Sequence, residues 1–247
     1  MKIGIISAMR EEMQELLNGL KNVTITHKGK RDYYEGILFE KEVVLVFSRW
    51  GKVASAVTTT QLINDFELSE IIFTGVAGAL NSDLNIGDVV IGKTLFQHDM
   101  DASPLFPKFE IPLLNKKGFE PQQNKRLINA TESFLSNFYQ LIPSEKAATF
   151  NIIAPKMIIG TILSGDQFIS SKEKIIALLK DLPQADCVEM EGAAIAQVCF
   201  EYNVPFSIIR IISDKAMDNS HVDFQKFAHE IASHYSNAIL KNYFSQI

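Results

Sequence analysis

The chain has 247 residues and a formal net charge of −5, and 47% of its residues are hydrophobic. This composition supplies apolar surface for a sizeable core, and its negative balance argues against a nucleic-acid-binding surface. No apolar run approaches the ~20 residues of a membrane-spanning helix, and no signal-peptide pattern precedes the first predicted strand. Cys187 and Cys199 have neither CxxC spacing nor histidine partners, so we expect reduced thiols in a cytoplasmic protein, without a zinc site.

The chain opens on a predicted buried strand, Lys2–Ser7, which is short, apolar and rich in β-branched residues. Apolar residues then recur at helical spacing from Met9 to Leu20, so Glu11 and Glu12 fall in the first turn of a helix. The helix dipole stabilises acids there without any catalytic duty. The same position is where open α/β sheets bind their ligands. Position alone leaves both interpretations open.

Strands and helices alternate along the rest of the chain, which predicts an α/β fold with a mixed central sheet and helices on both faces. Further strands are expected at Val43–Phe47, Ile71–Thr74, Asp88–Gly92, Met157–Leu163 and Ser207–Ser213, and helices at Gly51–Asp65 and Phe224–Ile239, the latter with Asp223 available as N-cap. No linker-like stretch or repeat divides the sequence. We therefore expect a single domain over residues 1–247.

Two segments contain glycines that suggest tight turns. Gly75-Val76-Ala77-Gly78 follows a predicted strand but is not GxGxxG, and Gly51-Lys52 lacks the upstream glycine of a P-loop. Neither therefore predicts a phosphate site. We interpret the first segment as a turn that lets the main chain approach a small ligand closely.

Acids also stand at the ends of predicted buried elements. Glu189 and Glu191 flank Met190 directly before a small, apolar run that predicts a buried helix, and the Ser207–Ser213 strand continues into Asp214. Buried acids are costly unless they are paired or used in acid/base chemistry. An N-cap and a strand-end turn explain either segment equally well when each is considered alone. The further acid at position 12 favours the interpretation that these acids share one cleft and serve acid/base chemistry there.

Taken together, several segments resemble the bacterial 5′-methylthioadenosine/S-adenosylhomocysteine nucleosidases of the purine nucleoside phosphorylase-like superfamily. They are 1–12, Gly51–Ala54, Thr74–Gly78, His98–Asp99, Ser164–Ile169, Val188–Glu191 with Ala194–Ala196, and Arg210–Asp214. They occur in order and at compatible spacing over nearly the whole chain. The resemblance implies a mixed sheet surrounded by helices, a homodimer, and no metal or cofactor.

The resemblance also implies residue roles in hydrolysis of the N-glycosidic bond of 5′-modified adenosines, such as methylthioadenosine, S-adenosylhomocysteine and 5′-deoxyadenosine. Glu12 would activate the water, Asp214 would protonate adenine N7, and Glu191 would hold the ribose hydroxyls. The other substrate-binding residues implied are Met9, Ala77, Gly78, Phe168, Ile169, Met190, Arg210 and Ser213.

Three segments depart from the family's usual pattern: Ser48-Arg49-Trp50-Gly51, Val76, and Met100–Lys117. Trp50 replaces a smaller aliphatic residue, and either lines the 5′ subsite or packs in the core. The proline-braced segment Pro104–Pro107 is expected to reach the active site of a partner subunit, because it would otherwise be an exposed apolar patch.

Two other functional classes are considered. One is a phosphorylase that uses phosphate as nucleophile, although a carboxylate at the turn after the first strand repels phosphate. The other is a non-catalytic nucleoside-binding protein, although binding alone would not require both an acid and a base.

Overall fold

The computed structural model describes residues 1–216 and 220–247, with residues 220–223 described by their backbone alone. Its strands are β1 (Lys2–Ser7), β2 (Lys21–Lys28), β3 (Arg31–Leu38), β4 (Lys41–Phe47), β5 (Leu68–Ala79), β6 (Val89–Gln97), β7 (Gly118–Phe119), β8 (Met157–Ser164), β9 (Ala185–Glu189) and β10 (Phe206–Asp214). Its helices are α1 (Gln14–Gly19), α2 (Lys52–Asp65), α3 (Lys125–Ser136), α4 (Phe138–Leu141), α5 (Ser144–Thr149), α6 (Lys172–Asp181), α7 (Gly192–Glu201), α8 (Ser220–Phe227) and α9 (Ser233–Phe244). A 3₁₀ turn (Glu11–Met13) precedes α1, and a π-helical turn (Ala228–Ala232) joins α8 to α9.

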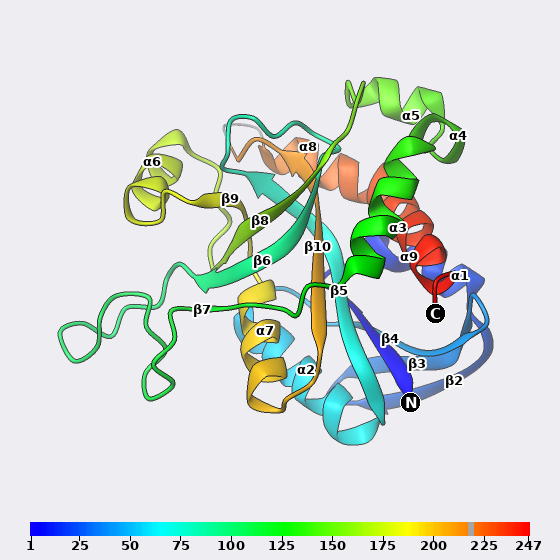
Figure 1. Cartoon of the computed structure of the whole chain (residues 1–247), viewed down its shortest axis with the longest axis horizontal. Coiled ribbons are helices and arrows are strands. Elements are labelled where there is room, and N and C mark those ends of the chain that lie inside the picture. The colour runs from blue at the N-terminus through cyan, green and yellow to red at the C-terminus, as the bar shows by residue number, and fades with distance from the viewer. Residues whose placement is uncertain (217–219) are drawn as a thin grey trace.

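A ten-stranded sheet runs through the centre of the molecule (Figure 1). Its strand order is β10-β6-β8-β9-β5-β1-β4-β3-β2, and β7 pairs with β6 outside this order. Because β10 also pairs with β5, one part of the sheet closes on itself. The β1–β4, β1–β5, β5–β10 and β6–β8 pairs are parallel, whereas β2–β3, β3–β4 and β6–β10 are antiparallel. The predicted mixed sheet is therefore confirmed.

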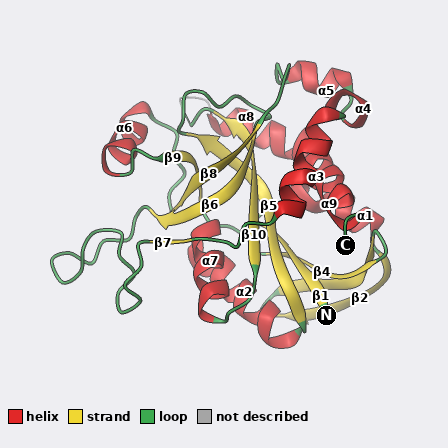
Figure 2. Ribbon diagram, viewed as in Figure 1, coloured by secondary structure: helices red, strands yellow, loops and turns green. Residues whose placement is uncertain are grey.

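Helices cover both faces of this sheet (Figure 2). Successive strand residues point to opposite faces, so β1 sends Ile3 and Ile5 into a core with α1, α3 and α9, and Ile6 into a second core with α2 and α7. None of the described helices is long and apolar enough to cross a membrane.

The parallel strands β1, β5 and β10 bring three predicted site segments to one edge of the sheet. Their registers align Ile6 with Phe73, and Asp214 with Gly78. Strand β9 arrives antiparallel to β5, with Val188 opposite Gly78, and so leads its following residues to the same place. Sheet topology alone therefore gathers segments that lie far apart in the sequence.

The predicted turn at Gly75–Gly78 is wrong, because β5 continues through these residues, paired with β10 as far as Gly78 and with β9 at Gly78 and Ala79. The glycine at position 75 serves packing instead of a turn. A Cβ atom there would lie 2.6 Å from Oε1 of Glu12 and 2.7 Å from Nη1 of Arg210.

Both predicted terminal helices form, with local differences. The first begins with the 3₁₀ turn, and the C-terminal helix already starts at Ser220 and contains a π-helical turn. The prediction that Asp223 acts as N-cap concerns a side chain outside the described residues.

Candidate active site

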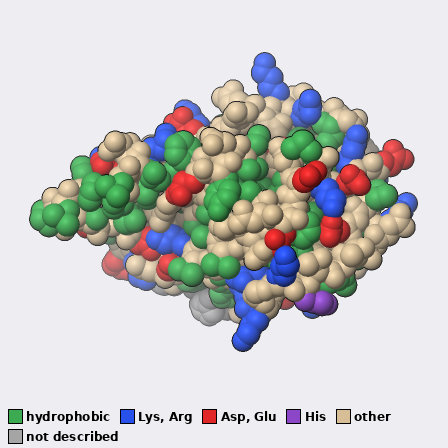
Figure 3. Space-filling model, turned by 90° about the horizontal axis from the view of Figure 1, so that it is seen from below, with side chains coloured by type: hydrophobic (Ala, Val, Ile, Leu, Met, Phe, Trp, Pro, Cys, Tyr) green, Lys and Arg blue, Asp and Glu red, His purple; other side chains and the backbone are tan. Residues whose placement is uncertain are grey.

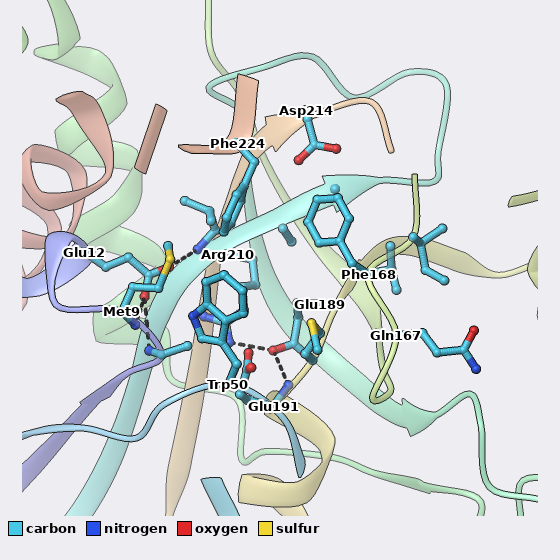
Figure 4. Close-up of a pocket in the computed structure, with 17 residues that line it drawn as sticks. Met9, Glu12, Trp50, Gln167, Phe168, Glu189, Glu191, Arg210, Asp214 and Phe224 are labelled. Carbon is cyan, nitrogen blue, oxygen red and sulfur yellow. Dashed lines mark hydrogen bonds and ion pairs between the residues drawn. The ribbon is translucent and has the colours of Figure 1, made fainter. Parts of the chain in front are cut away.

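An open cleft with about 590 Å³ of empty space lies where β1, β5, β9 and β10 converge (Figure 4). Acids, aromatic rings and main chain share its wall. The lining residues are Ala8, Met9, Glu12, Trp50, Val76, Ala77, Gly78, Gln167, Phe168, Ile169, Val188, Glu189, Met190, Glu191, Arg210, Asp214 and Phe224.

Glu12 is a buried carboxylate held entirely by main chain. Its Oε2 atom accepts hydrogen bonds from the N–H groups of Ala8 (3.1 Å) and Met9 (3.0 Å), and its Oε1 atom accepts one from Val76 (3.0 Å). Burial raises the pKa of Glu12 to about 7, against the opposing effects of Arg210 and these three donors. The neighbouring Glu11 is exposed, so the structure separates two acids that sequence position could not.

Glu191 is the second buried acid of the cleft and lies directly before α7. Its Oε1 atom accepts a hydrogen bond of 2.8 Å from the Gly51 N–H. Burial and the nearby Glu189 carboxylate raise the pKa of Glu191 to about 8, although the Gly51 N–H and Arg210 oppose this rise. A carboxyl group at this pKa is readily ionised by ligand groups that donate hydrogen bonds to it.

Glu189 has a different environment from Glu191, because it is saturated by protein donors. It forms an ion pair of 2.7 Å with Nη2 of Arg210 and accepts hydrogen bonds from the N–H groups of Glu191 and Gly192 and from the Ser164 hydroxyl. The Arg210 guanidinium also stacks on the Phe73 ring, with Cζ 3.7 Å from the ring centroid. Glu189 and Arg210 thus form a buried structural pair beneath the cleft.

Asp214 ends β10 on another side of the cleft from Glu12 (Figure 4). Its Oδ2 atom accepts a hydrogen bond of 2.8 Å from the Ser213 hydroxyl, and its Oδ1 atom accepts one of 2.7 Å from the Ala216 N–H. A Cβ on Gly78 would lie 3.1 Å from Asp214 Oδ1, so a small residue suits this position. Ser213, which the resemblance placed among the substrate-binding residues, therefore contacts Asp214 but does not line the cleft.

Three aromatic rings form the mouth of the cleft. Phe224 makes edge-to-face contacts with Trp50 at 6.2 Å and with Phe168 at 5.7 Å between ring centroids. Trp50 is 56% exposed, so the interpretation of it as a core residue is wrong. Such a rim offers apolar, polarisable surface to a flat base or a thioether.

The described residues contain no cluster of His, Cys, Asp or Glu side chains that could hold a metal ion. Among the described residues that line the cleft, Arg210 is the one basic side chain, and Glu189 already neutralises it. The cleft wall is thus rich in acids and poor in free positive charge.

A family model described as "Phosphorylase superfamily" matches residues 2–245. A 5′-methylthioadenosine/S-adenosylhomocysteine nucleosidase from Staphylococcus aureus is 36% identical over 237 residues, which cover 96% of each chain. The chain belongs to this nucleosidase family. A solved nucleosidase from Neisseria meningitidis, in complex with methylthio-immucillin-A, is 33% identical with a TM-score of 0.83, and covers 100% of this chain and 99% of that one. A futalosine hydrolase from Helicobacter pylori is similar too, with 33% identity, a TM-score of 0.82, and coverage of 100% and 98%.

The structure brings together nearly all the residues that the sequence resemblance to this nucleosidase family singled out. Except for Ser213, each of them lines the cleft. Sequence reasoning did not select Phe224, which it assigned to the buried face of the C-terminal helix, nor Ala8, Gln167 and Val188. The helical spacing of Phe224 predicts a core residue and does not indicate that its side chain also lines the cleft.

Proposed function

We propose that this protein hydrolyses the N-glycosidic bond of 5′-modified adenosines and releases adenine. The observation that carries the proposal is a buried carboxylate of near-neutral pKa, Glu12, in the same cleft as a second acid, Asp214. Cleavage of this bond develops positive charge on the ribose and negative charge on the base. It therefore needs a proton donor at the base and an activated nucleophile at the sugar.

Glu12 is the proposed general base that takes a proton from the attacking water. A general base works best when its pKa lies near the working pH, and burial gives Glu12 a pKa of about 7. Three main-chain donors fix its carboxylate without neutralising it. Asp214 is the proposed general acid toward adenine N7, with Ser213 as its positioning partner.

Glu191 is proposed to accept hydrogen bonds from the ribose hydroxyls, a charge-assisted and geometrically demanding contact. One of its oxygens accepts the Gly51 N–H, and Glu191 lines the same cleft as Glu12 and the aromatic rim. Phe168 would stack on adenine, with the Ile169 main chain at the edge of the base. Met9 and Met190 would contact the sugar, while Ala77 and Gly78 let the main chain approach the ligand.

Charge supports hydrolysis over phosphorolysis. A phosphate nucleophile needs cationic or main-chain donors, yet the donors beside Glu12 are already bound to that carboxylate. Arg210, the basic residue among the described cleft residues, is paired with Glu189. A water molecule fits this environment better than a phosphate dianion.

The substrates we propose are methylthioadenosine, S-adenosylhomocysteine and 5′-deoxyadenosine, with a preference for short 5′ groups. Trp50 and Phe224 narrow the end of the cleft where the 5′ group would lie. The experiment is to follow adenine release from these nucleosides and from aminofutalosine, in phosphate-free buffer and with added phosphate. Release that is equally fast without phosphate supports the proposal, and release that requires phosphate would make the protein a phosphorylase.

We further propose a homodimer in the cytoplasm. The β6–β7 connection projects from the body, with Leu105 84% and Leu113 85% exposed, and apolar side chains gather at that end of the molecule (Figure 3). A patch of this kind favours an interface. Both cysteines are buried free thiols, which suits a reducing compartment. A fully active monomer in sedimentation at micromolar concentration would rule out the dimer.

A further inference from the structure

Three segments at the cleft meet in a closed ring of hydrogen bonds beside it, which we name the Lys52 ring after Lys52, Asp99 and Asp166. The Lys52 ammonium donates to Oδ1 of Asp99 at 2.6 Å. Oδ2 of Asp99 accepts the Asp166 N–H at 2.9 Å. Oδ1 of Asp166 accepts the Lys52 N–H at 2.7 Å, which closes the ring.

Asp166 is exposed, but the Lys52–Asp99 pair within the Lys52 ring is more than a surface ion pair, whose contribution is usually about 0–1 kcal/mol. The Lys52 and Asp99 side chains are only 17% and 18% exposed, and Gln97 also accepts from the Lys52 ammonium at 3.1 Å. Although burial opposes it, the contacts with Lys52 and with the Asp166 N–H hold the pKa of Asp99 below its ordinary value. Two of the three links use main-chain donors, so they fix backbone as well as side chains.

Each main-chain link lies next to a residue of the cleft. Gly51 precedes Lys52 and donates its N–H to Glu191, while Trp50 precedes Gly51. A Cβ on Gly51 would lie 2.9 Å from Oδ1 of Asp166, and the φ angle of +91° at Gly51 also favours glycine. On the other side, Phe168 follows Asp166 by two residues and lines the opposite wall.

We propose that Lys52, Asp99 and Asp166 are positioning residues that hold the two walls of the substrate cleft, Trp50-Gly51 and Phe168, in register across the ribose carboxylate Glu191. This inference rests on the proposed function and adds residues that contact no substrate. The ring makes no hydrogen bond to Glu12 or Asp214 among the described contacts, so it sets substrate binding and leaves the proton transfers alone.

The kinetic test uses Lys52→Met, Asp99→Asn and Asp166→Ala. Each breaks one of the three links, and each should raise KM for methylthioadenosine about ten-fold, as expected for the loss of a charge-assisted hydrogen bond, with kcat kept within about three-fold. Asp166→Asn retains an acceptor oxygen and should restore KM. The double variant Lys52→Met/Asp99→Asn should be no worse than either single variant, because both break the same link.

The matched control is Lys28→Met. Lys28 forms an ion pair of equal length, 2.6 Å, with Asp65 at the far end of the same helix α2. It should leave KM and kcat unchanged. A ring variant that lowers kcat at constant KM would show a loss of folded enzyme and overturn the proposal, as would additive effects in the double variant.

A spectroscopic readout separates failure of this inference from failure of the proposed function. Trp50 is the sole tryptophan of the chain, so its fluorescence reports on the wall that the ring holds. Acrylamide quenching should increase, and the Kd for adenine should rise about ten-fold, in Asp99→Asn but not in Lys28→Met, whether or not any nucleoside is hydrolysed. Wild-type quenching and adenine affinity in all three ring variants would overturn the inference and leave the proposed reaction untouched.

Discussion

Replacing Glu12 with glutamine removes the proposed base while keeping the size of the side chain. The carboxylate accepts from Val76 with one oxygen and from Ala8 and Met9 with the other. A glutamine amide must direct its NH₂ group at one of these donor sets in either orientation. The substitution therefore leaves buried main-chain donors unsatisfied, which costs about 1–3 kcal/mol of stability.

The catalytic loss is larger than this structural cost. A positioned acid or base contributes about 10²–10⁴-fold to the rate, so kcat should fall by that factor. With a pKa of about 7, Glu12 in the wild type is about half ionised at pH 7 and about one-tenth ionised at pH 6. Wild-type kcat/KM, whose pH profile reports groups of the free enzyme, should thus fall about ten-fold per pH unit below pH 7.

The assay measures adenine release between pH 5 and 9 at methylthioadenosine concentrations well below KM, where the rate follows kcat/KM and reports groups of the free enzyme. Glu12→Gln should lose both the activity and the decline of the rate below pH 7, which is the acidic limb of the pH profile. Glu11→Gln, which removes the same charge from the adjacent exposed residue, should behave as wild type. Near-normal turnover of Glu12→Gln, or an acidic limb that survives it, would refute the assignment.

Other outcomes test individual contacts of the site. Glu191→Gln should lower kcat with little change in melting temperature. Glu189→Gln should chiefly destabilise the protein, by about 3–5 kcal/mol, because it leaves Arg210 buried and unpaired. Equal losses of kcat in the two variants would remove the reason for choosing Glu191 as the ribose-binding acid. Trp50→Ile should reduce the ratio of kcat/KM for methylthioadenosine to that for S-adenosylhomocysteine, by an amount equivalent to about 1–3 kcal/mol. An unchanged ratio would show that Trp50 does not line the 5′ subsite. Burial raises the pKa of Glu191 to about 8, so above the unfolded-state pKa the folded form retains a proton that the unfolded form has lost. The free energy of unfolding should therefore decline from about pH 5 to pH 8, by at most about 1.4 kcal/mol per pH unit for each such acid. A melting temperature that depends on pH as strongly in Glu191→Gln as in the wild type would contradict this.

Periodicity predicted strands β1, β4, β5, β6, β8 and β10 but not β2, β3, β7 or β9, and it gave no prediction for helices α3 to α6. The apolar runs at Lys2–Ser7 and Met157–Leu163 and the helical spacing of Gly51–Asp65 correspond closely to β1, β8 and α2. The segment Gly75–Gly78 was mistaken for a turn because glycine is common in turns. Its glycine at position 75 is required instead by two long side chains that approach from other elements, which no local pattern reveals.

The site was predictable where a residue type coincides with a strand end, as at Asp214. The resemblance selected Glu12, but position in the first helical turn alone could not choose between Glu11 and Glu12, because that choice depends on which side of a single 3₁₀ turn faces the sheet. Phe224 carries the helical spacing of a core residue and does pack against the core, but its contacts with Trp50 and Phe168 in the cleft are made with distant segments. Lys52, Asp99 and Asp166 lie in segments that carry the resemblance, but the sequence did not reveal their contacts with one another, because they lie far apart along the chain.

The central claim is that water, and not phosphate, is the nucleophile opposite adenine. The most direct measurement identifies the sugar product from methylthioadenosine in phosphate buffer by ³¹P NMR and mass spectrometry. Hydrolysis with Glu12 as base predicts free 5-methylthioribose and adenine in equal amounts, with no new phosphorus signal. A sugar 1-phosphate that accumulates in step with adenine would contradict the account.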